Sequence, residues 1–286
     1  MGLSVEQLGV HLDAMSRVPS EKWLSGLEDR KRKELEFHDQ YRDHTLKRQT
    51  QQDSDTFEKL YGNEKYYNTT RRSNEYVANW LKSHVPGKIF LDYACGDGHS
   101  AIAAAKAGAA LSIGIDISPI SVQNGTRTAA QVGIADRCRF VQADAENTNL
   151  PDNSVDVILC SGMLHHLDLS YAFPELRRIL APGGKILAVE ALDYNPLIKL
   201  YRMMTPAMRT EWEKAHILSL KDVRFAKRFF DIGEVKYWHI ASPLAASATG
   251  LLPVFEAFDS VLTHLPLAQL MAWIFTFELK KPVRAS

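Results

Sequence analysis

The chain has 286 residues, enough for one large α/β domain with additions or for two small domains. Its 34 basic and 34 acidic side chains give a net charge of zero, which supplies no general electrostatic reason to expect a nucleic-acid partner. The three cysteines form no Cys-x-x-Cys pair and lie in or beside apolar runs. They therefore indicate buried thiols in a reducing, cytoplasmic compartment and no cysteine metal site, and we expect no bound metal. The first residues lack the pattern of a signal peptide.

Residues 1–85 are rather polar, and the sequence predicts mainly helices there, as a cap separate from the rest of the chain. Residues 27–43 are dense in charges of both signs with few apolar positions, which is typical of a solvated helix. Residues 50–55 are polar and are predicted to form a loop. Tyr76, Trp80 and Leu81 have the spacing of a helix that ends near residue 85.

From residue 88 apolar strands alternate with helices, a pattern that predicts a parallel sheet covered on both faces. The expected strands are residues 88–94, 110–116, 138–144, 155–162 and 185–192, and the expected helices lie within 99–108, 120–133 (in its later part) and 172–180. Residues 190–230 read as a largely helical insertion. A sixth strand at 233–242, an apolar helical stretch at 250–273 and a last strand at 274–282 complete the pattern.

The glycine turn Gly96-x-Gly98-x-x-Ala101 comes after the first strand and suits either a dinucleotide or the nucleoside of a methyl donor. Asp116, which closes the second strand, can accept ribose hydroxyl protons from both classes of cofactor. Asp92 before the turn and Asp97 within it would repel a pyrophosphate, whereas Asp92 would attract the ammonium group of a methionine. The acidic residues therefore favour a nucleoside that carries an amino acid over a nicotinamide dinucleotide.

Five ordered motifs, LDYACGDG, GIDIS, QADAENTNLP, DVILCSGMLHHL and LAPGGKILAVE, resemble those of class I S-adenosylmethionine-dependent methyltransferases. The resemblance is dense over residues 90–190 and loose beyond them. It implies a Rossmann-like α/β fold: a seven-stranded sheet whose last strand is antiparallel, helices on both faces, an N-terminal helical cap and helical insertions after the fifth and sixth strands. One departure is Ala94, where the family often has glycine.

The resemblance also implies a cofactor, S-adenosylmethionine, and a set of residues around it. Asp92, Ala94, Gly96 and Gly98 would line the methionine end; Asp116 would hold the ribose; Ile117 would pack on the adenine; Asp144 and Ala145 would read the adenine edge; and the backbone of Cys160 and Ser161 would face the sulfonium or ammonium. In this family an N-terminal segment often closes over the cofactor, and Tyr61, Tyr66 and Tyr67 are candidates for such a lid, with packing in the core as the alternative. The expected division is a cap or lid at residues 1–85 and a methyltransferase domain at 86–286.

A base is needed only if the acceptor atom does not lose its proton readily. His166 lies after the fourth strand and Glu190 ends the fifth, which the family places beside it. We expect a Glu190–His166 hydrogen bond to raise the basicity of His166, with a purely pocket-shaping His166 as the alternative. His165 is expected to be structural.

The sequence thus predicts methyl transfer to a small molecule, on a hydroxyl or carboxyl oxygen of a secondary metabolite or lipid-like compound. Methylation of carbon or nitrogen, a cofactor binder without activity and, less favoured, a nicotinamide-dependent oxidoreductase are the alternatives. Residues 260–277 contain no charged side chain; we expect an apolar wall or a surface that rests on a membrane there, and no spanning helix.

Overall fold

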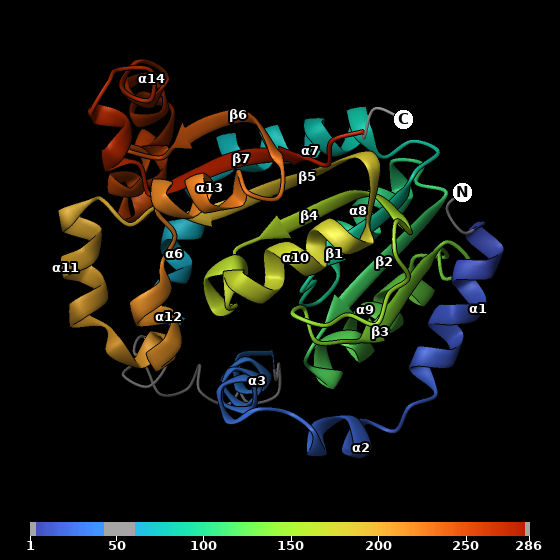
Figure 1. Cartoon of the computed structure of the whole chain (residues 1–286). Coiled ribbons are helices and arrows are strands. Elements are labelled where there is room, and N and C mark those ends of the chain that lie inside the picture. Colours follow the sequence, from blue (N-terminus) through green and yellow to red (C-terminus); the bar gives the residue numbers. More distant parts are fainter. Residues whose placement is uncertain (1–3, 43–60, 284–286) are drawn as a thin grey trace.

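The computed structural model describes residues 4–42 and 61–283 and contains a seven-stranded sheet in the order β3-β2-β1-β4-β5-β7-β6 (Figure 1). The strands are β1 Ile89–Tyr93, β2 Leu111–Asp116, β3 Cys138–Gln142, β4 Val155–Ser161, β5 Leu180–Ala191, β6 Asp231–Trp238 and β7 Ile274–Lys280. β7 runs antiparallel to both β5 and β6, while the pairs among β1 to β5 are parallel. The predicted methyltransferase-like sheet with an antiparallel last strand is confirmed. The expected loop at residues 50–55 lies outside the described residues.

One face of the sheet is covered by α7 (Arg71–His84), α8 (His99–Lys106) and α9 (Pro119–Gln131). Trp80 and Leu81 of α7 are buried against Phe90 of β1, because burial of large apolar side chains is the main favourable term in packing a helix on a sheet. α9 begins at Pro119, earlier than the sequence indicated. The Ser118 hydroxyl accepts the N–H of Ser121 and caps the helix, and proline is favoured in the first turn.

The other face is covered by α1 (Val5–Ser16), α10 (Leu169–Ile179) and α13 (Leu220–Ala226). Between β3 and β4 the chain forms no helix, and α1 packs beside β3 with Leu8 and Leu12 fully buried in the main core. His11 Nε2 lies 2.8 Å from the carbonyl oxygen of Asn149 in the β3–β4 connection. Within the described part of residues 1–85, α1 and α7 therefore lie on opposite faces of the sheet.

The remaining described helices gather near the ends of the sheet. They are α2 (Ser20–Ser25), α3 (Asp29–Arg42), α6 (Glu64–Tyr67), α11 (Pro196–Met204), α12 (Glu211–His216) and α14 (Leu252–Leu262), with short 3-10 helices at Leu164–His166, Pro206–Met208, Ser242–Ser247, Thr249–Leu251 and Ala268–Met271. α3, α6, α11 and α12 lie toward the carboxyl ends of the parallel strands, where open α/β sheets bind ligands (Figure 1). The insertions expected after the fifth and sixth strands are present. Among the helices of residues 4–42 and 61–283, none has the length and apolar character needed to cross a bilayer.

Candidate active site

The turn after β1 has a left-handed backbone at Ala94, Gly96 and Gly98, with φ values of 57°, 51° and 79°. A side chain at Gly98 would collide with the ring of Phe140, so only glycine fits there. Asp116 holds the turn from β2, because its Oδ2 accepts the Gly96 N–H at 2.8 Å and its Oδ1 accepts the Ser118 N–H at 2.9 Å. Gly96 and Gly98 are thus needed for the shape of the turn, whatever ligand lies above it.

Asp92 is a buried carboxyl group directly beneath the turn, where its Oδ2 accepts the Ala101 N–H at 3.0 Å. Burial raises the pKa of Asp92 to about 8, and the nearby Asp116 charge adds to the rise. Burial also raises the pKa of Asp116. A ligand cation placed beside Asp92 would favour its ionised form, which is the chemistry expected of a methionine ammonium. Asp97, in contrast, is occupied by Asn124 Nδ2 at 3.0 Å and by Arg42 Nη1 at 3.5 Å.

A cleft lies at the ends of β1, β2 and β4. Of the residues predicted to bind the cofactor, those in the lining of this cofactor cleft are Ala94, Asp116, Ile117, Asp144, Ala145 and Ser161. Asp92, Gly96 and Gly98 build the turn. Tyr67 instead lines two neighbouring clefts, and its contact with the cofactor stays a prediction.

α3 covers the cofactor cleft, which the sequence reasoning missed. Lys31 Nζ lies 2.6 Å from Asp144 Oδ2 and 2.9 Å from Glu146 Oε2, and Arg30 Nη2 lies 2.6 Å from Glu146 Oε1. Burial by itself would lower the pKa of Lys31, but the hydrogen bonds and charges of Asp144 and Glu146 outweigh it and raise that pKa. The charges of Arg30 and Lys31 are therefore not simply solvated. A signal was present in the four-residue spacing of Arg30, Glu34, His38 and Arg42, which places all four on one face of a helix.

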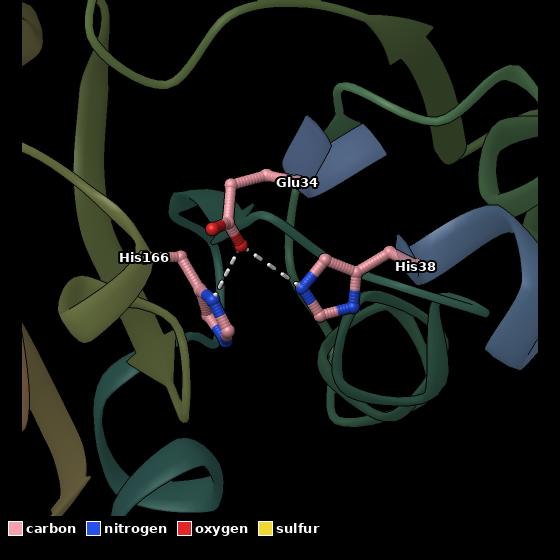
Figure 2. A group of neighbouring side chains, drawn as sticks. All are labelled: Glu34, His38 and His166. Carbon is pink, nitrogen blue, oxygen red and sulfur yellow. Dashed lines mark hydrogen bonds and ion pairs between the residues drawn. The ribbon is translucent and has the colours of Figure 1, made fainter. Parts of the chain in front are cut away.

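Two histidine–carboxylate pairs lie next to each other after β4. Glu190 Oε2 is 2.6 Å from His165 Nδ1, and Glu190 Oε1 accepts the N–H groups of Met163 and Leu164 at 2.9 and 2.8 Å. His166 Nδ1 lies 2.9 Å from Glu34 Oε2 of α3 (Figure 2). The predicted hydrogen bond between Glu190 and His166 is thus wrong: Glu190 contacts His165, and the partner of His166 is Glu34 of α3.

A second cleft joins the cofactor cleft through shared lining residues, among them His38, Ser161 and His166. It continues into a third cleft through Tyr67, His165 and Glu213, which line both. The third cleft has mainly apolar and aromatic walls, with Tyr66, Tyr67, Leu197, Tyr201, Leu244 and Trp273 among its lining residues and with the cations Arg202 and Arg209. We call the second and third clefts together the acceptor clefts. The three clefts lead from the glycine turn, past both histidines, to an apolar mouth.

Residues 91–188 match the family model described as "Methyltransferase domain". A solved structure with the same fold is the geranyl diphosphate C-methyltransferase of Streptomyces coelicolor A3(2), bound to Mg²⁺, geranyl diphosphate and S-adenosyl-L-homocysteine; it has a TM-score of 0.55 at 18% identity over 74% of this chain and 80% of that one. Over residues 91–188 the chain therefore carries a methyltransferase domain of the class I S-adenosylmethionine-dependent type. The methyltransferase is also similar to the ribosomal protein L11 methyltransferase of Photobacterium profundum, with 29% identity over 50% of this chain and 49% of that protein. The 27-O-demethylrifamycin SV methyltransferase of Amycolatopsis mediterranei is 34% identical over 41% of this chain and 43% of that protein.

The chain spans about half, or less, of the length of these curated relatives, and the match to the family model runs from β1 to β5. S-adenosylmethionine is the cofactor of the family, and the donor set in the cleft fits it. Asp116 and Asp144 line the cleft and offer carboxylate oxygens that can accept hydrogen bonds from ribose hydroxyls and from an adenine amine. The buried Asp92 at the turn can balance the charge of an ammonium group. The structure further shows that α3 and the acceptor clefts come largely from segments outside the matched region.

Proposed function

We propose that this methyltransferase transfers a methyl group to a small, lipid-like acceptor, at an oxygen atom. The observation that carries the proposal is the passage from the cofactor cleft to an apolar acceptor cleft, with two histidines at the junction. When bound, S-adenosylmethionine would supply an activated methyl carbon, which the acceptor atom attacks in line while S-adenosylhomocysteine departs as the leaving group. The protein must then align the acceptor, exclude water and remove a proton. Alignment alone is worth up to about 7–11 kcal/mol in well-oriented model reactions.

For the cofactor we propose the roles that the sequence suggested, with one change. Asp92 takes the ammonium group, Asp116 takes the ribose hydroxyls, and Asp144 with the Ala145 N–H reads the adenine edge. Ile117 packs on the base and the Ser161 backbone faces the reacting end. Tyr67 is moved from the cofactor to the acceptor, because it lines both acceptor clefts and its ring centroid lies 5.3 Å from that of Trp273.

For the base we propose His165, oriented by Glu190. A carboxylate on Nδ1 fixes the tautomer and leaves Nε2 as the proton acceptor, an arrangement common to catalytic histidines. His165 lines both acceptor clefts, whereas His166 lines the cofactor cleft and the nearer acceptor cleft. His166, the base expected from the sequence, remains the second candidate because it too faces the junction.

The acceptor class is inferred from the walls of the cleft and from the surface around its mouth. The exposed apolar residues of α11 and of the segment around α14 form what we call the end patch: Leu197, Leu200, Met203, Met204, Leu244, Leu251, Val254, Phe258 and Val261. α11 and α14 lie at the same end of the sheet (Figure 1), and Leu197 and Leu244 belong both to this patch and to the lining of the cleft. An apolar surface continuous with an apolar cleft suits an enzyme that rests on a membrane and takes an amphiphilic acceptor from it.

The experiment is an acceptor screen with isotopically labelled S-adenosylmethionine, lipid and natural-product acceptors, and mass spectrometry of the products. We expect label in an amphiphilic product as an O-methyl group. A labelled C-methyl or N-methyl product would replace the oxygen assignment and keep the enzyme class. Tight binding of NAD without binding of S-adenosylhomocysteine would overturn the proposal altogether.

A further inference from the structure

Glu34, His38 and His166 converge at the junction of the cofactor cleft and the nearer acceptor cleft, and the proposed chemistry gives His38 no role. Their ligand atoms, one carboxylate oxygen and two imidazole nitrogens, all lie within 4.8 Å of one another. Figure 2 shows the Glu34 carboxylate pointing between the two rings. We propose that these three side chains bind one divalent transition-metal ion, Zn²⁺ or Fe²⁺, that holds the acceptor oxygen. This departs from the sequence-based expectation of no metal.

Glu34 Oε2 lies close to ring nitrogens of both histidines. Glu34 Oε2 lies 3.8 Å from His38 Nε2, too long for a hydrogen bond, and 2.9 Å from His166 Nδ1. Zinc ligands at about 2.0–2.2 Å from the ion lie roughly 2.9 Å apart at a right angle and about 3.4 Å apart at a tetrahedral angle. The two separations from Glu34 Oε2 therefore differ from those between zinc ligands by at most a few tenths of an ångström.

The chemistry of the donors indicates the class of metal. Two imidazoles and one carboxylate are a usual set for zinc and for non-haem iron(II), whereas Mg²⁺ and Ca²⁺ prefer oxygen ligands. The Glu34 side chain is 7% exposed, so its charge is shielded from solvent and calls for a partner cation. The nearby Arg42 guanidinium is directed to Asp97, 3.5 Å away.

The placement leaves room for a substrate at the ion. Three protein ligands leave at least one coordination position open, the pattern of catalytic rather than structural zinc sites. His38 and His166 line both the cofactor cleft and the nearer acceptor cleft, so an open position there meets the reacting atoms. The ligands come from α3 and from the 3-10 helix after β4, and the ion would therefore also fasten α3 over the cofactor.

This inference rests on the proposed transfer to oxygen. An acceptor hydroxyl bound to the ion is more acidic, as metal-bound water is. Its proton passes to His165 Nε2, the oxygen lone pair forms the new bond to the methyl carbon, and the carbon–sulfur bond breaks with its electron pair staying on sulfur. The ion neither gains nor loses electrons. His165 lies close by, because the ring centroids of His165 and His166 are 4.1 Å apart.

The test is metal binding by the full chain, free of any histidine tag. Protein stripped with a chelator is titrated with Zn²⁺ by calorimetry, Co²⁺ is added separately for its visible absorption, and metal content after purification is measured by mass spectrometry. The variants are His38→Ala, His38→Asn and Glu34→Gln. The matched control is His264→Ala, which removes an exposed histidine. Binding of S-adenosylhomocysteine is measured on each sample, and circular dichroism checks folding.

We expect one ion per chain, a Co²⁺ spectrum of low-symmetry nitrogen and oxygen ligation, and a loss of metal affinity of at least about 100-fold in the ligand variants. The control variant should bind as the parent does. Failure to bind Zn²⁺ or Fe²⁺ at micromolar concentration, or equal binding by the parent and both His38 variants, would overturn the metal site. Because S-adenosylhomocysteine binding is read separately, loss of the metal alone leaves the proposed methyl transfer standing. Loss of S-adenosylhomocysteine binding by the parent chain would overturn the proposed function instead.

Discussion

Glu190 Oε2 lies 2.6 Å from Nδ1 of His165, while His166, the next residue, pairs with Glu34 at 2.9 Å. The two neighbouring imidazoles therefore have separate carboxylates, one from β5 and one from α3. The different partners fit the two roles proposed above, a base for His165 and a metal ligand for His166, which the sequence of paired histidines does not distinguish. Substitutions at the two positions can therefore be compared directly.

His165→Ala is expected to lower the rate of methyl transfer by about 10²–10⁴-fold, the usual contribution of a general base, with little change in the affinity for S-adenosylhomocysteine. Steady-state and single-turnover assays with a saturating acceptor check this. Glu190→Gln keeps the size of the side chain but weakens the orientation of His165, so its loss of rate should be smaller. If His166→Ala binds Zn²⁺ as the parent does but loses as much rate as His165→Ala, and His165→Gln is fully active, the base is His166.

Asp92 links binding of the cofactor to a proton. Its pKa of about 8 means that the group is mostly protonated at pH 7 in the free protein, and a ligand ammonium beside it favours the ionised form. We expect binding of S-adenosylhomocysteine at pH 7 to release up to one proton, measured by calorimetry in buffers of different ionisation enthalpy. The release should fade above pH 9 and be absent in Asp92→Asn. If Asp92→Asn releases as much proton on binding as the parent does, the proton comes from another group.

The same group sets a direction for stability. A carboxyl whose pKa is raised on folding holds a proton in the folded state that the unfolded state has already lost, between about pH 4 and pH 8. The contribution of Asp92 to the free energy of unfolding therefore falls as pH rises through that window. Denaturant unfolding of the free protein should show Asp92→Asn gaining stability relative to the parent between pH 5 and pH 8. The opposite trend would contradict the raised pKa.

The sheet was predictable because its signal is local. Each strand carries an apolar run, and its bounds in the structure lie within a few residues of the expected ones; β5 departs most and starts at Leu180. The glycine turn and Asp116 were predictable for the same reason. The partners of His166 and Asp144 were not, because Glu34 and Lys31 reach them from more than 110 residues away in the sequence. Nothing in the periodicity of α3 says which part of the sheet its charged face meets. The sequence also assigned Glu190 to His166 instead of His165. The cause is similar, because the conformation of the short 3-10 helix at Leu164–His166 decides which ring turns toward β5.

α1 offers a test of the division at residue 85. Leu12 is 1% exposed in the main core, so Leu12→Ala should lower the free energy of unfolding by about 2–5 kcal/mol. Val10 lies on the same helix and is 68% exposed, and Val10→Ala should change it by less than about 0.5 kcal/mol. Equal and small effects in urea unfolding would mean that α1 is a dispensable cap.

α3 is expected to control how fast the cofactor leaves. Lys31 is 12% exposed and joins Asp144 and Glu146, so Lys31→Ala removes a partly buried link between α3 and the rim of the cleft. We expect the dissociation rate of S-adenosylhomocysteine to rise by about 5–30-fold, as loss of about 1–2 kcal/mol from the closed form implies. Stopped-flow displacement measures that rate, and Lys33→Ala, at an exposed position of the same helix, should leave it unchanged. A slower dissociation in Lys31→Ala would mean instead that Lys31 competes with the adenine for Asp144.

The end patch predicts binding to lipid surfaces. Met203 on α11 is 77% exposed and Phe258 on α14 is 57% exposed, and both would lose apolar contact with a bilayer if replaced by an acidic residue. The double variant Met203→Glu/Phe258→Glu is expected to bind neutral phosphatidylcholine vesicles at least about 10-fold more weakly than the parent, measured by co-sedimentation. Val10→Glu, at an equally exposed apolar position on α1, is the control and should bind as the parent does. A parent chain that stays in the supernatant at all vesicle concentrations would show that the patch does not rest on a membrane. If the parent then associates with itself in sedimentation experiments as its concentration rises, and the double variant does not, the patch is a contact between copies of this chain.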